Sequence, residues 1–192
     1  MDAAEVLILE QGFAATSIDS VIARTGLTKG GFFHHFKSKA DLAYALVERY
    51  ASRDAALLDD NLTRAERLAR DPLQQLLVFV GLFIEATSEL TEPNPGCLFA
   101  TYCYEADLFD ARTLEIVRQA MLVWRERLGG KLAQAIDLHP PRLPVTADTL
   151  ADMMTVVFEG AYVLSRTIKE PQVLAAQLAH YRNYLELLFA RP

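Results

Sequence analysis

The stretch from residue 16 to residue 46 combines helix-start signals with a glycine turn, and it constrains the fold more than any other part of the chain. Its first helix has one apolar face, because apolar residues recur at i, i+3 and i+4: Ile18, Val21 and Ile22. Gly26 can adopt the left-handed conformation that ends a helix, and Leu27 is the expected buried residue of the turn. Thr28 then begins a second, short helix over residues 29–36. Two helices joined by such a turn form a helix-turn-helix.

Hydroxyl side chains indicate where the helices of this stretch begin. Thr16 is a candidate N-cap of the first helix, and Asp19 three residues later completes a capping-box pattern. Ser38 and Asp41 repeat the pattern at the start of a third helix. The spacing therefore predicts three helices, of which the second would enter the major groove of DNA.

The charges of this stretch suit a phosphate backbone. From residue 21 to residue 40 there is no Asp or Glu, whereas the whole chain carries 25 acidic against 19 basic side chains. The basic and histidine side chains of the segment are Arg24, Lys29, His34, His35, Lys37 and Lys39. DNA binding needs a local positive face rather than a positive total, so the segment predicts a DNA-binding surface.

Two glycines stand near the start of the short second helix. Gly30 and Gly31 each cost about 1 kcal/mol of helix propensity relative to Ala, so a helix this short should gain something from them. Without Cβ atoms, the backbone N–H groups there can approach a phosphate or a base edge closely. The alternative is a glycine-rich helix start with a solvated basic face, and spacing and charge together make it the weaker interpretation.

These features carry a resemblance to a known family. The pattern T-S-I-x-x-V-I-A-x-x-x-L-T-K-G-G-F-F-H-H-F-K-S-K-x-x-L, within residues 12–46, resembles the DNA-binding domain of TetR-type transcriptional regulators. The resemblance implies an all-helical homodimer with a small-molecule pocket in its C-terminal domain. It also implies DNA contacts by Thr16, Ser17, Thr28, Lys29, Gly30, His34, His35 and Lys39. Phe33 departs from the family's usual Tyr and lacks the hydroxyl that would reach a phosphate.

Helix signals continue along the remaining chain, and no segment alternates with the period of a strand. We predict a long helix from residue 38 to about 58, a charged segment at 62–70, and later helix starts at Asp71-Pro72, Asp110, Thr146 and Pro171. The predicted fold is all-α, with an N-terminal three-helix DNA-binding domain at residues 1–48 and a larger helical domain at 49–192 for ligand binding and dimerisation. About 50 residues are marginal in isolation, so the first domain should share a core with later parts of the chain.

Composition and motif content limit the alternatives. No apolar run approaches the ~20 residues that cross a bilayer, and the chain lacks a signal-peptide pattern, so we expect no membrane partner and a cytoplasmic location. Two cysteines, Cys97 and Cys103, provide no disulfide framework. The usual motifs of catalysis, phosphate binding and metal ligation are absent from the sequence, so we predict no catalytic residue, metal or cofactor.

The last two helices carry apolar stripes that suit a contact with a second chain. After Thr146 the stripe comprises Met153, Val156, Val157, Gly160, Ala161 and Leu164. On the last helix it comprises Leu174, Leu178, Tyr181, Leu185 and Leu188. Two such helices repeated by a two-fold axis form a four-helix interface. Periodicity alone equally allows both stripes to pack on their own chain, and the family resemblance favours the dimer.

Aromatic side chains of the middle helices are the candidate lining of a ligand pocket. The predicted set is Phe79, Phe83, Phe99, Tyr102, Cys103, Met121, Trp124, Phe158 and Tyr162, with Glu105 and Arg125 as polar partners. The alternative for each of them is ordinary core. Gly96-Cys97-Leu98 also resembles a subgroup of these regulators in which a cysteine senses electrophiles, and the alternative there is that Cys97 is a small buried residue.

Together these inferences predict a homodimeric repressor that binds a palindromic operator and is released by a small-molecule effector. Ligand would favour a dimer whose recognition helices no longer match the ~34 Å spacing of the half-sites. The competing interpretation is a helical-bundle carrier or enzyme without a DNA role. An enzyme should show paired titratable groups in its pocket.

Overall fold

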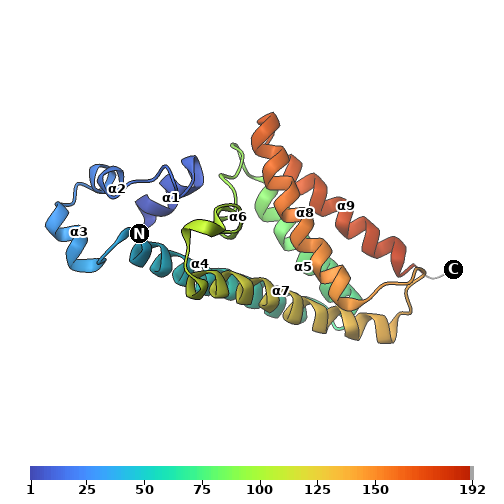
Figure 1. The fold of residues 1–192 in the computed structure, drawn as a ribbon. Helices are drawn as coiled ribbons and strands as arrows, with labels where there is room; N and C mark the ends of the chain where they lie inside the picture. Colours follow the sequence, from blue (N-terminus) through green and yellow to red (C-terminus); the bar gives the residue numbers. More distant parts are fainter. Residues whose placement is uncertain (191–192) are drawn as a thin grey trace. The chain divides into compact units, whose positions relative to one another are not determined.

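Helices account for all regular secondary structure in the described residues, 1–190 of the computed structural model, and no strand occurs among them (Figure 1). In chain order the helices are α1 (Asp2–Gln11), α2 (Ile18–Thr25), α3 (Lys29–His35), α4 (Lys39–Leu68), α5 (Pro72–Ser88), α6 (Leu98–Tyr104), the 3-10 helix η1 (Ala106–Leu108), α7 (Ala111–Leu138), α8 (Ala147–Ile168) and α9 (Val173–Leu188). The predicted all-α fold class is therefore confirmed. Among the described helices, none combines the length and the apolar character that crossing a bilayer requires.

The chain forms two compact units. The first unit contains Met1–Asp54 together with Pro95–Ala120, and the second contains Ala55–Asn94 together with the residues from Met121 onward. Helices α4 and α7 each begin in the first unit and end in the second. The first unit thus includes a segment from the middle of the chain, in agreement with the expectation that the N-terminal helices share a core with later residues.

Side-chain caps explain where several helices begin. Asp71, Asp110 and Thr146 each accept a hydrogen bond from the backbone N–H three residues later, at 3.0, 2.7 and 3.2 Å. Such caps satisfy N–H groups that have no partner inside the helix. These three predicted starts are confirmed, whereas α9 begins at Val173, slightly after the predicted Pro171.

Helix α2 begins one residue later than the sequence predicted. Its N-cap is Ser17, whose hydroxyl accepts from the Ser20 N–H while the Ser20 hydroxyl accepts from the Ser17 N–H, both at 3.0 Å. The predicted pair of Thr16 and Asp19 is wrong, because the Thr16 side chain is buried and donates to the Gly12 carbonyl at 2.8 Å. Two adjacent hydroxyl residues could each cap the helix, and burial decides between them.

Helix α4 continues past its predicted end near Leu58 and includes most of the charged segment at 62–70. Three apolar residues with helical spacing explain the extension, since Leu58 and Ala65 are buried and Leu62 is half-buried between them. The charged residues around them are mostly Arg and Glu, which are good helix formers. The charged residues here therefore form the solvated face of a helix.

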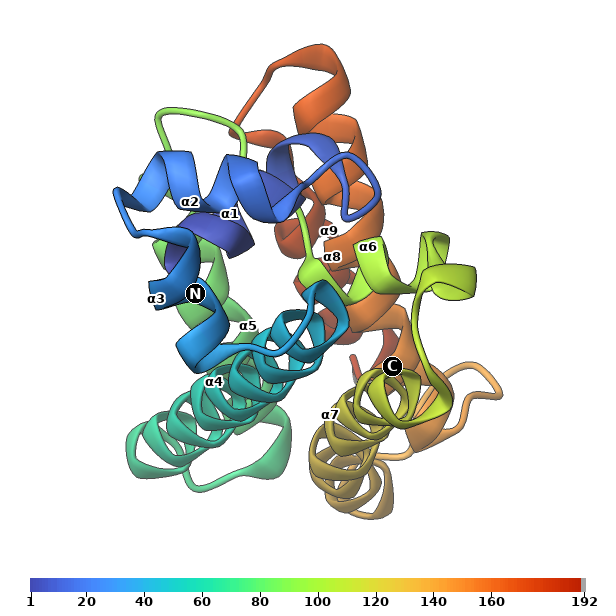
Figure 2. The ribbon, with the colours of Figure 1, turned by 60° about the vertical axis from the view of Figure 1, so that its left-hand side comes forward.

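In the second unit, α9 packs against both α5 and α8 (Figures 1 and 2). The core of this contact includes Phe79 and Val80 of α5 and Met154 of α8, none of which is exposed. Tyr181 of α9 is also buried, and its hydroxyl donates to the Leu150 carbonyl at 2.9 Å. Burial raises the pKa of this hydroxyl, so it remains a neutral donor.

These contacts divide the predicted dimer stripes into buried and exposed parts. The buried residues, packed on their own chain, are Ala161 of α8 and Leu174, Leu178, Tyr181, Leu185 and Leu188 of α9. For them the interpretation as an interface between chains is wrong, because periodicity shows that a face is buried without showing what buries it. On α8, by contrast, Val156 is 68% exposed and Leu164 45%, and Val163, which was not in the predicted stripe, is 58% exposed. One face of α8 is therefore both apolar and solvent-exposed.

Leu185→Glu should destabilise the second unit severely, because it places an unpaired carboxylate where the native side chain is fully buried. We expect the unfolding free energy to fall by about 3–5 kcal/mol, as for other uncompensated buried charges. Urea unfolding followed by circular dichroism measures the loss. Leu143→Glu, in the loop after α7, is the control and should change the free energy by less than about 0.5 kcal/mol. Equal losses in the two variants would contradict the burial of α9.

Candidate DNA-binding surface and ligand cleft

The turn between α2 and α3 is fixed by hydrogen bonds at both ends. Gly26 adopts the predicted left-handed conformation, with a φ of 69°, and its N–H donates to the Ile22 carbonyl at 2.9 Å. Thr28 caps α3 as predicted, because its hydroxyl accepts from the Gly31 N–H at 3.1 Å. The prediction that Leu27 is buried is wrong, since 46% of its surface is exposed. The buried apolar contact of this region comes from Phe32 instead.

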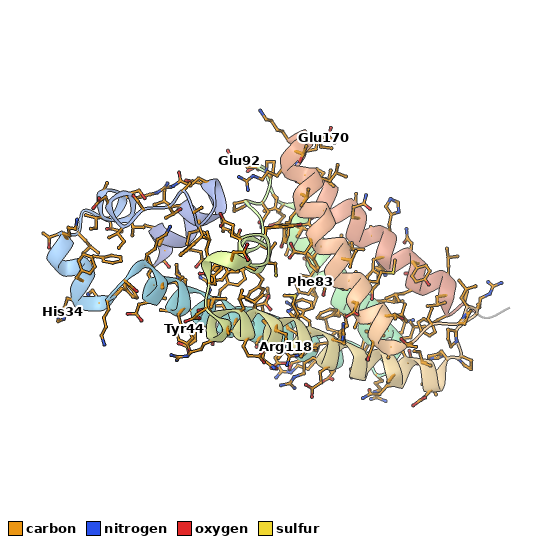
Figure 3. The ribbon with its side chains drawn as sticks, viewed as in Figure 1. His34, Tyr44, Phe83, Glu92, Arg118 and Glu170 are labelled. Carbon is orange, nitrogen blue, oxygen red and sulfur yellow. The ribbon has the colours of Figure 1, made fainter. Side chains whose placement is uncertain are left out.

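Helix α3 has one buried anchor and an exposed polar face. Phe32 is 2% exposed and packs against Phe36, with 5.6 Å between the ring centroids. Lys29, Gly30, His34 and His35 are exposed, and His34 is labelled in Figure 3. Lys29 lies 3.6 Å from Asp19 in an exposed ion pair of a kind that contributes little to stability. Lys29 can therefore exchange this partner for a phosphate at small cost.

The two glycines of α3 have different surroundings. A Cβ atom at Gly31 would lie 3.3 Å from the hydroxyl oxygen of Thr28, so glycine there leaves room for the cap. A Cβ atom at Gly30 would meet no atom of the described chain within 4 Å. Packing inside the protein therefore gives no reason for Gly30. Its cost in helix propensity is explained if another molecule comes close to this backbone.

The second unit contains a cleft with a volume of about 470 Å³, within the usual range for small-molecule sites. Its walls come from α4, α5 and α8. The apolar part is formed by Leu57, Leu82, Phe83, Phe158 and Tyr162, and Phe83 is labelled in Figure 3. The polar part includes Asn61, Arg64, Glu85 and Glu89.

Comparison with known proteins agrees with both features. Residues 1–46 match the family described as bacterial regulatory proteins, tetR family, and residues 72–181 match the tetracyclin repressor-like C-terminal domain. The chain belongs to the TetR family. It is therefore a transcriptional regulator with a helix-turn-helix DNA-binding domain and a ligand-binding domain.

Individual TetR-family proteins are similar over most of the chain. The transcriptional regulator AcuR of Cereibacter sphaeroides is 26% identical over 171 residues, which cover 87% of this chain and 74% of AcuR. A TetR-family regulator from Agrobacterium tumefaciens has a similar structure, with a TM-score of 0.78 at 24% identity over 98% of this chain and 95% of that one. The reduced form of E. coli NemR gives a TM-score of 0.76 at 19% identity, over 95% and 92%. At these identities the structural likeness supports the fold alone.

Two side chains that the TetR resemblance assigned to DNA form hydrogen bonds within the protein. Thr16 is buried, and its hydroxyl donates a hydrogen bond to the Gly12 carbonyl. The Lys39 ammonium donates to the Phe13 carbonyl at 2.5 Å and lies 4.1 Å from the centroid of the Phe13 ring. Burial lowers the pKa of Lys39. The remaining predicted contacts are all exposed, namely Ser17, Thr28, Lys29, Gly30, His34 and His35.

Glu105, predicted as a polar partner of the ligand, instead holds the turn between α1 and α2. Its carboxylate accepts hydrogen bonds from the Phe13 N–H at 2.6 Å and the Ala14 N–H at 3.2 Å. The Lys39 ammonium donates to the Phe13 carbonyl. One acidic side chain therefore binds N–H groups of this turn, and one basic side chain binds a carbonyl group. Sequence reasoning missed this role, because more than ninety residues separate Phe13 from Glu105. The other predicted partner, Arg125, is paired with Asp152 at 2.8 Å.

Six of the predicted pocket residues belong to the second unit. Phe83, Phe158 and Tyr162 line the cleft. Phe79 and Trp124 form an aromatic layer around Phe83, with ring centroids 5.2 and 6.0 Å from it. Met121, the sixth, is half-buried. Prediction therefore found the aromatic side of the cleft. It missed Asn61 and Arg64, because α4 was not expected to continue through the charged segment.

The other three predicted pocket residues belong to the first unit. Phe99 packs edge-on against Tyr50 with 4.8 Å between ring centroids. Tyr102 is stacked on Phe109 at 4.1 Å, and Cys103 is exposed. For Phe99 and Tyr102 these contacts agree with the alternative of ordinary core. Cys97 is 8% exposed, which agrees with the alternative of a small buried residue.

Lys39→Ala should lower the stability of this TetR-family protein more than the replacement of an exposed lysine would. It removes a charge-assisted hydrogen bond to the Phe13 carbonyl, and we expect a loss of about 1–3 kcal/mol of unfolding free energy. Lys37→Ala, at an exposed neighbour, is the control and should leave stability unchanged in the same thermal melt. Wild-type stability in Lys39→Ala would instead favour the phosphate contact implied by the family resemblance.

Proposed function

We propose that this TetR-family regulator is a repressor that binds a palindromic operator as a homodimer and leaves it when a small-molecule effector binds. The observation that carries the proposal is the exposed face of α3. Packing inside the protein does not require a glycine at position 30 of this face. In this proposal α3 enters the major groove, as in other helix-turn-helix proteins. The protein is expected to act in the cytoplasm.

Within this surface, each exposed residue has a proposed role. Lys29 contacts a phosphate, and Thr28, Gly30 and His34 lie nearest the bases. Ser17 and His35 contact the sugar-phosphate backbone. Thr16 and Lys39 act indirectly, because they fix the start of α2 and the turn that precedes it. Positioning contacts of this kind set the register of the recognition helix without reading sequence.

The exposed apolar face of α8 supports a homodimer. Val156, Gly160 and Val163 follow one another at i, i+4 and i+7, so they lie on one face of the helix. A second copy related by a two-fold axis would cover the same face on both chains. A stable interface requires at least ~1,000 Å² of buried area, which neighbouring residues of α8 and the exposed side of α9 would supply.

The cleft of the second unit supports an effector role for a small molecule. An effector releases DNA only if it binds the DNA-free conformation more tightly, and such couplings are typically 1–3 kcal/mol. Linkage then requires that operator DNA weakens effector binding by the same factor. This reciprocity separates a regulator from a carrier, whose ligand affinity would not change on adding DNA.

Selection of bound sequences from a random DNA library by the purified protein tests the proposal. Enrichment of an inverted repeat with half-sites one helical turn apart is the expected outcome. If the protein enriches no DNA sequence from the library, yet binds or converts small molecules, the result would support the alternative of a carrier or enzyme.

Lys29→Ala should weaken binding to every DNA sequence alike and reduce the slope of log affinity against log salt by about one. The physical reason is the loss of one phosphate contact and its released counterion. Fluorescence anisotropy of a labelled operator at several salt concentrations measures both quantities. Lys169→Asn, at the left-handed residue that ends α8, removes the same charge elsewhere and should leave the slope unchanged. An unaltered slope in Lys29→Ala would remove Lys29 from the interface.

Val156→Glu combined with Val163→Glu should separate the dimer, because each chain would bring two carboxylates into the apolar interface. Both side chains are exposed in the single chain, so the fold itself should survive. Light scattering should report a monomer, and operator affinity should fall by at least about ten-fold. Leu138→Glu, at the exposed end of α7, is the control and should remain dimeric. A wild-type protein that is monomeric at micromolar concentration would contradict the proposed dimer.

A further inference from the structure

The apolar wall of the cleft is aromatic. The ring of Phe158 lies edge-on to Phe83 with 5.2 Å between centroids, and Tyr162 follows at 6.1 Å from Phe158. Aromatic faces carry partial negative charge and attract cations within about 6 Å of the ring centroid. This wall can therefore hold an apolar or aromatic body, and a positive group lying over a ring face would be attracted to it.

Two carboxylates stand on the α5 side of the cleft. Glu85 lies in the last turn of α5, and Glu89 follows the end of that helix, so the two stand at positions i and i+4. Like charges at this spacing repel each other. The C-terminal end of a helix carries a partial negative charge, which makes the same position unfavourable for acidic side chains. The local electrostatics are thus unfavourable for the protein alone, and a bound cation would relieve them.

One positive side chain opposes this field. Arg64 of α4 is exposed on the cleft wall and forms no ion pair within 4 Å in the described part of the chain. One guanidinium against two carboxylates leaves the titratable lining with a net negative charge. The C-terminal end of α5 adds to it with the same sign. The two carboxylates and the helix end therefore both favour a cationic ligand, and Arg64 is the residue that discriminates between the two signs.

We propose that the effector cleft takes an amphiphilic organic cation, with an apolar or aromatic body against Phe83 and Phe158 and a positively charged nitrogen facing Glu85 and Glu89. The inference rests on the proposed function only in treating the cleft as the effector site. Direct binding in the absence of DNA tests the ligand class separately from operator release. A cation that binds without releasing the operator would retain this inference and overturn the regulatory one.

The test uses three probes that share a phenylbutyl group and differ in the terminal group, which is trimethylammonium, hydroxymethyl or carboxylate. Isothermal titration calorimetry with the full chain measures each affinity. Fluorescence of Trp124, the single tryptophan, reports on binding beside the cleft, because its ring centroid lies 6.2 Å from that of Phe158. We expect the ammonium probe to bind at least about ten-fold more tightly than the other two.

Charge-neutralising variants identify the groups responsible. Glu85→Gln combined with Glu89→Gln should weaken the ammonium probe at least about five-fold and leave the neutral probe unchanged. Arg64→Met should strengthen the ammonium probe. Glu126→Gln, on α7 and outside the cleft, is the matched control and should bind all probes as the wild type does. Circular dichroism melts check that the variants remain folded.

Three outcomes would overturn the proposal. The first is a carboxylate probe that binds most tightly and is lost in Arg64→Met. The second is an ammonium probe that binds the double Gln variant as tightly as the wild type. The third is a wild-type protein to which none of the probes binds at millimolar concentration.

Discussion

The burial of Tyr102 is the interaction on which the first unit depends. Its ring is fully buried, stacked on Phe109 and close to Phe13, and its hydroxyl donates to the Ala43 carbonyl at 2.8 Å. Burial raises the pKa of the hydroxyl, so it stays protonated and keeps its donor role. A buried hydroxyl without a partner would be costly, and this one has a partner on α4. The packing of α4 and of the turn at Phe13 therefore depends on a residue from the middle of the chain.

Polar contacts extend that dependence to the turn before α2. Glu105 lies one residue after α6 and holds the N–H groups of Phe13 and Ala14, while Lys39 at the start of α4 holds the Phe13 carbonyl. Arg49 adds ion pairs from α4 to Asp2 and Glu5 of α1. Charged side chains thus hold α1 and the turn that follows it, beside an apolar core that includes Ile8 and Leu42.

Sequence reasoning succeeded where the determinant is local. Gly26 and the caps at Asp71 and Thr146 are readable because each signal acts within four residues. It missed contacts whose partner is distant in sequence. The lysine predicted to touch phosphate has its acceptor 26 residues away, and no local pattern marks a backbone carbonyl as needing an ammonium. The stripe of α9 fails for a related reason, since a buried face has the same period whichever chain covers it.

One wall of the cleft was predicted from the sequence and the other was not. Its aromatic wall was predicted, because large apolar side chains with helical spacing must be buried somewhere and a pocket is one such place. Its charged wall was not, because Arg64 and Glu85 are indistinguishable in sequence from solvated helix faces. Only the placement of α4 against α5 and α8 brings them to one opening. The aromatic side of such a site is therefore easier to predict than the polar side that selects the ligand.

The tight approach of Gly12 to Glu105 has a consequence for how the chain can evolve. Gly12 has a φ of 86°, which L side chains rarely adopt, and a Cβ atom there would lie 3.1 Å from Oε1 of Glu105. A larger residue at position 12 would strain the backbone and also displace the carboxylate that holds the next two N–H groups. Positions 12 and 105 are therefore expected to covary in related chains. Lineages that lose this glycine would need a different connection between α6 and the helix-turn-helix.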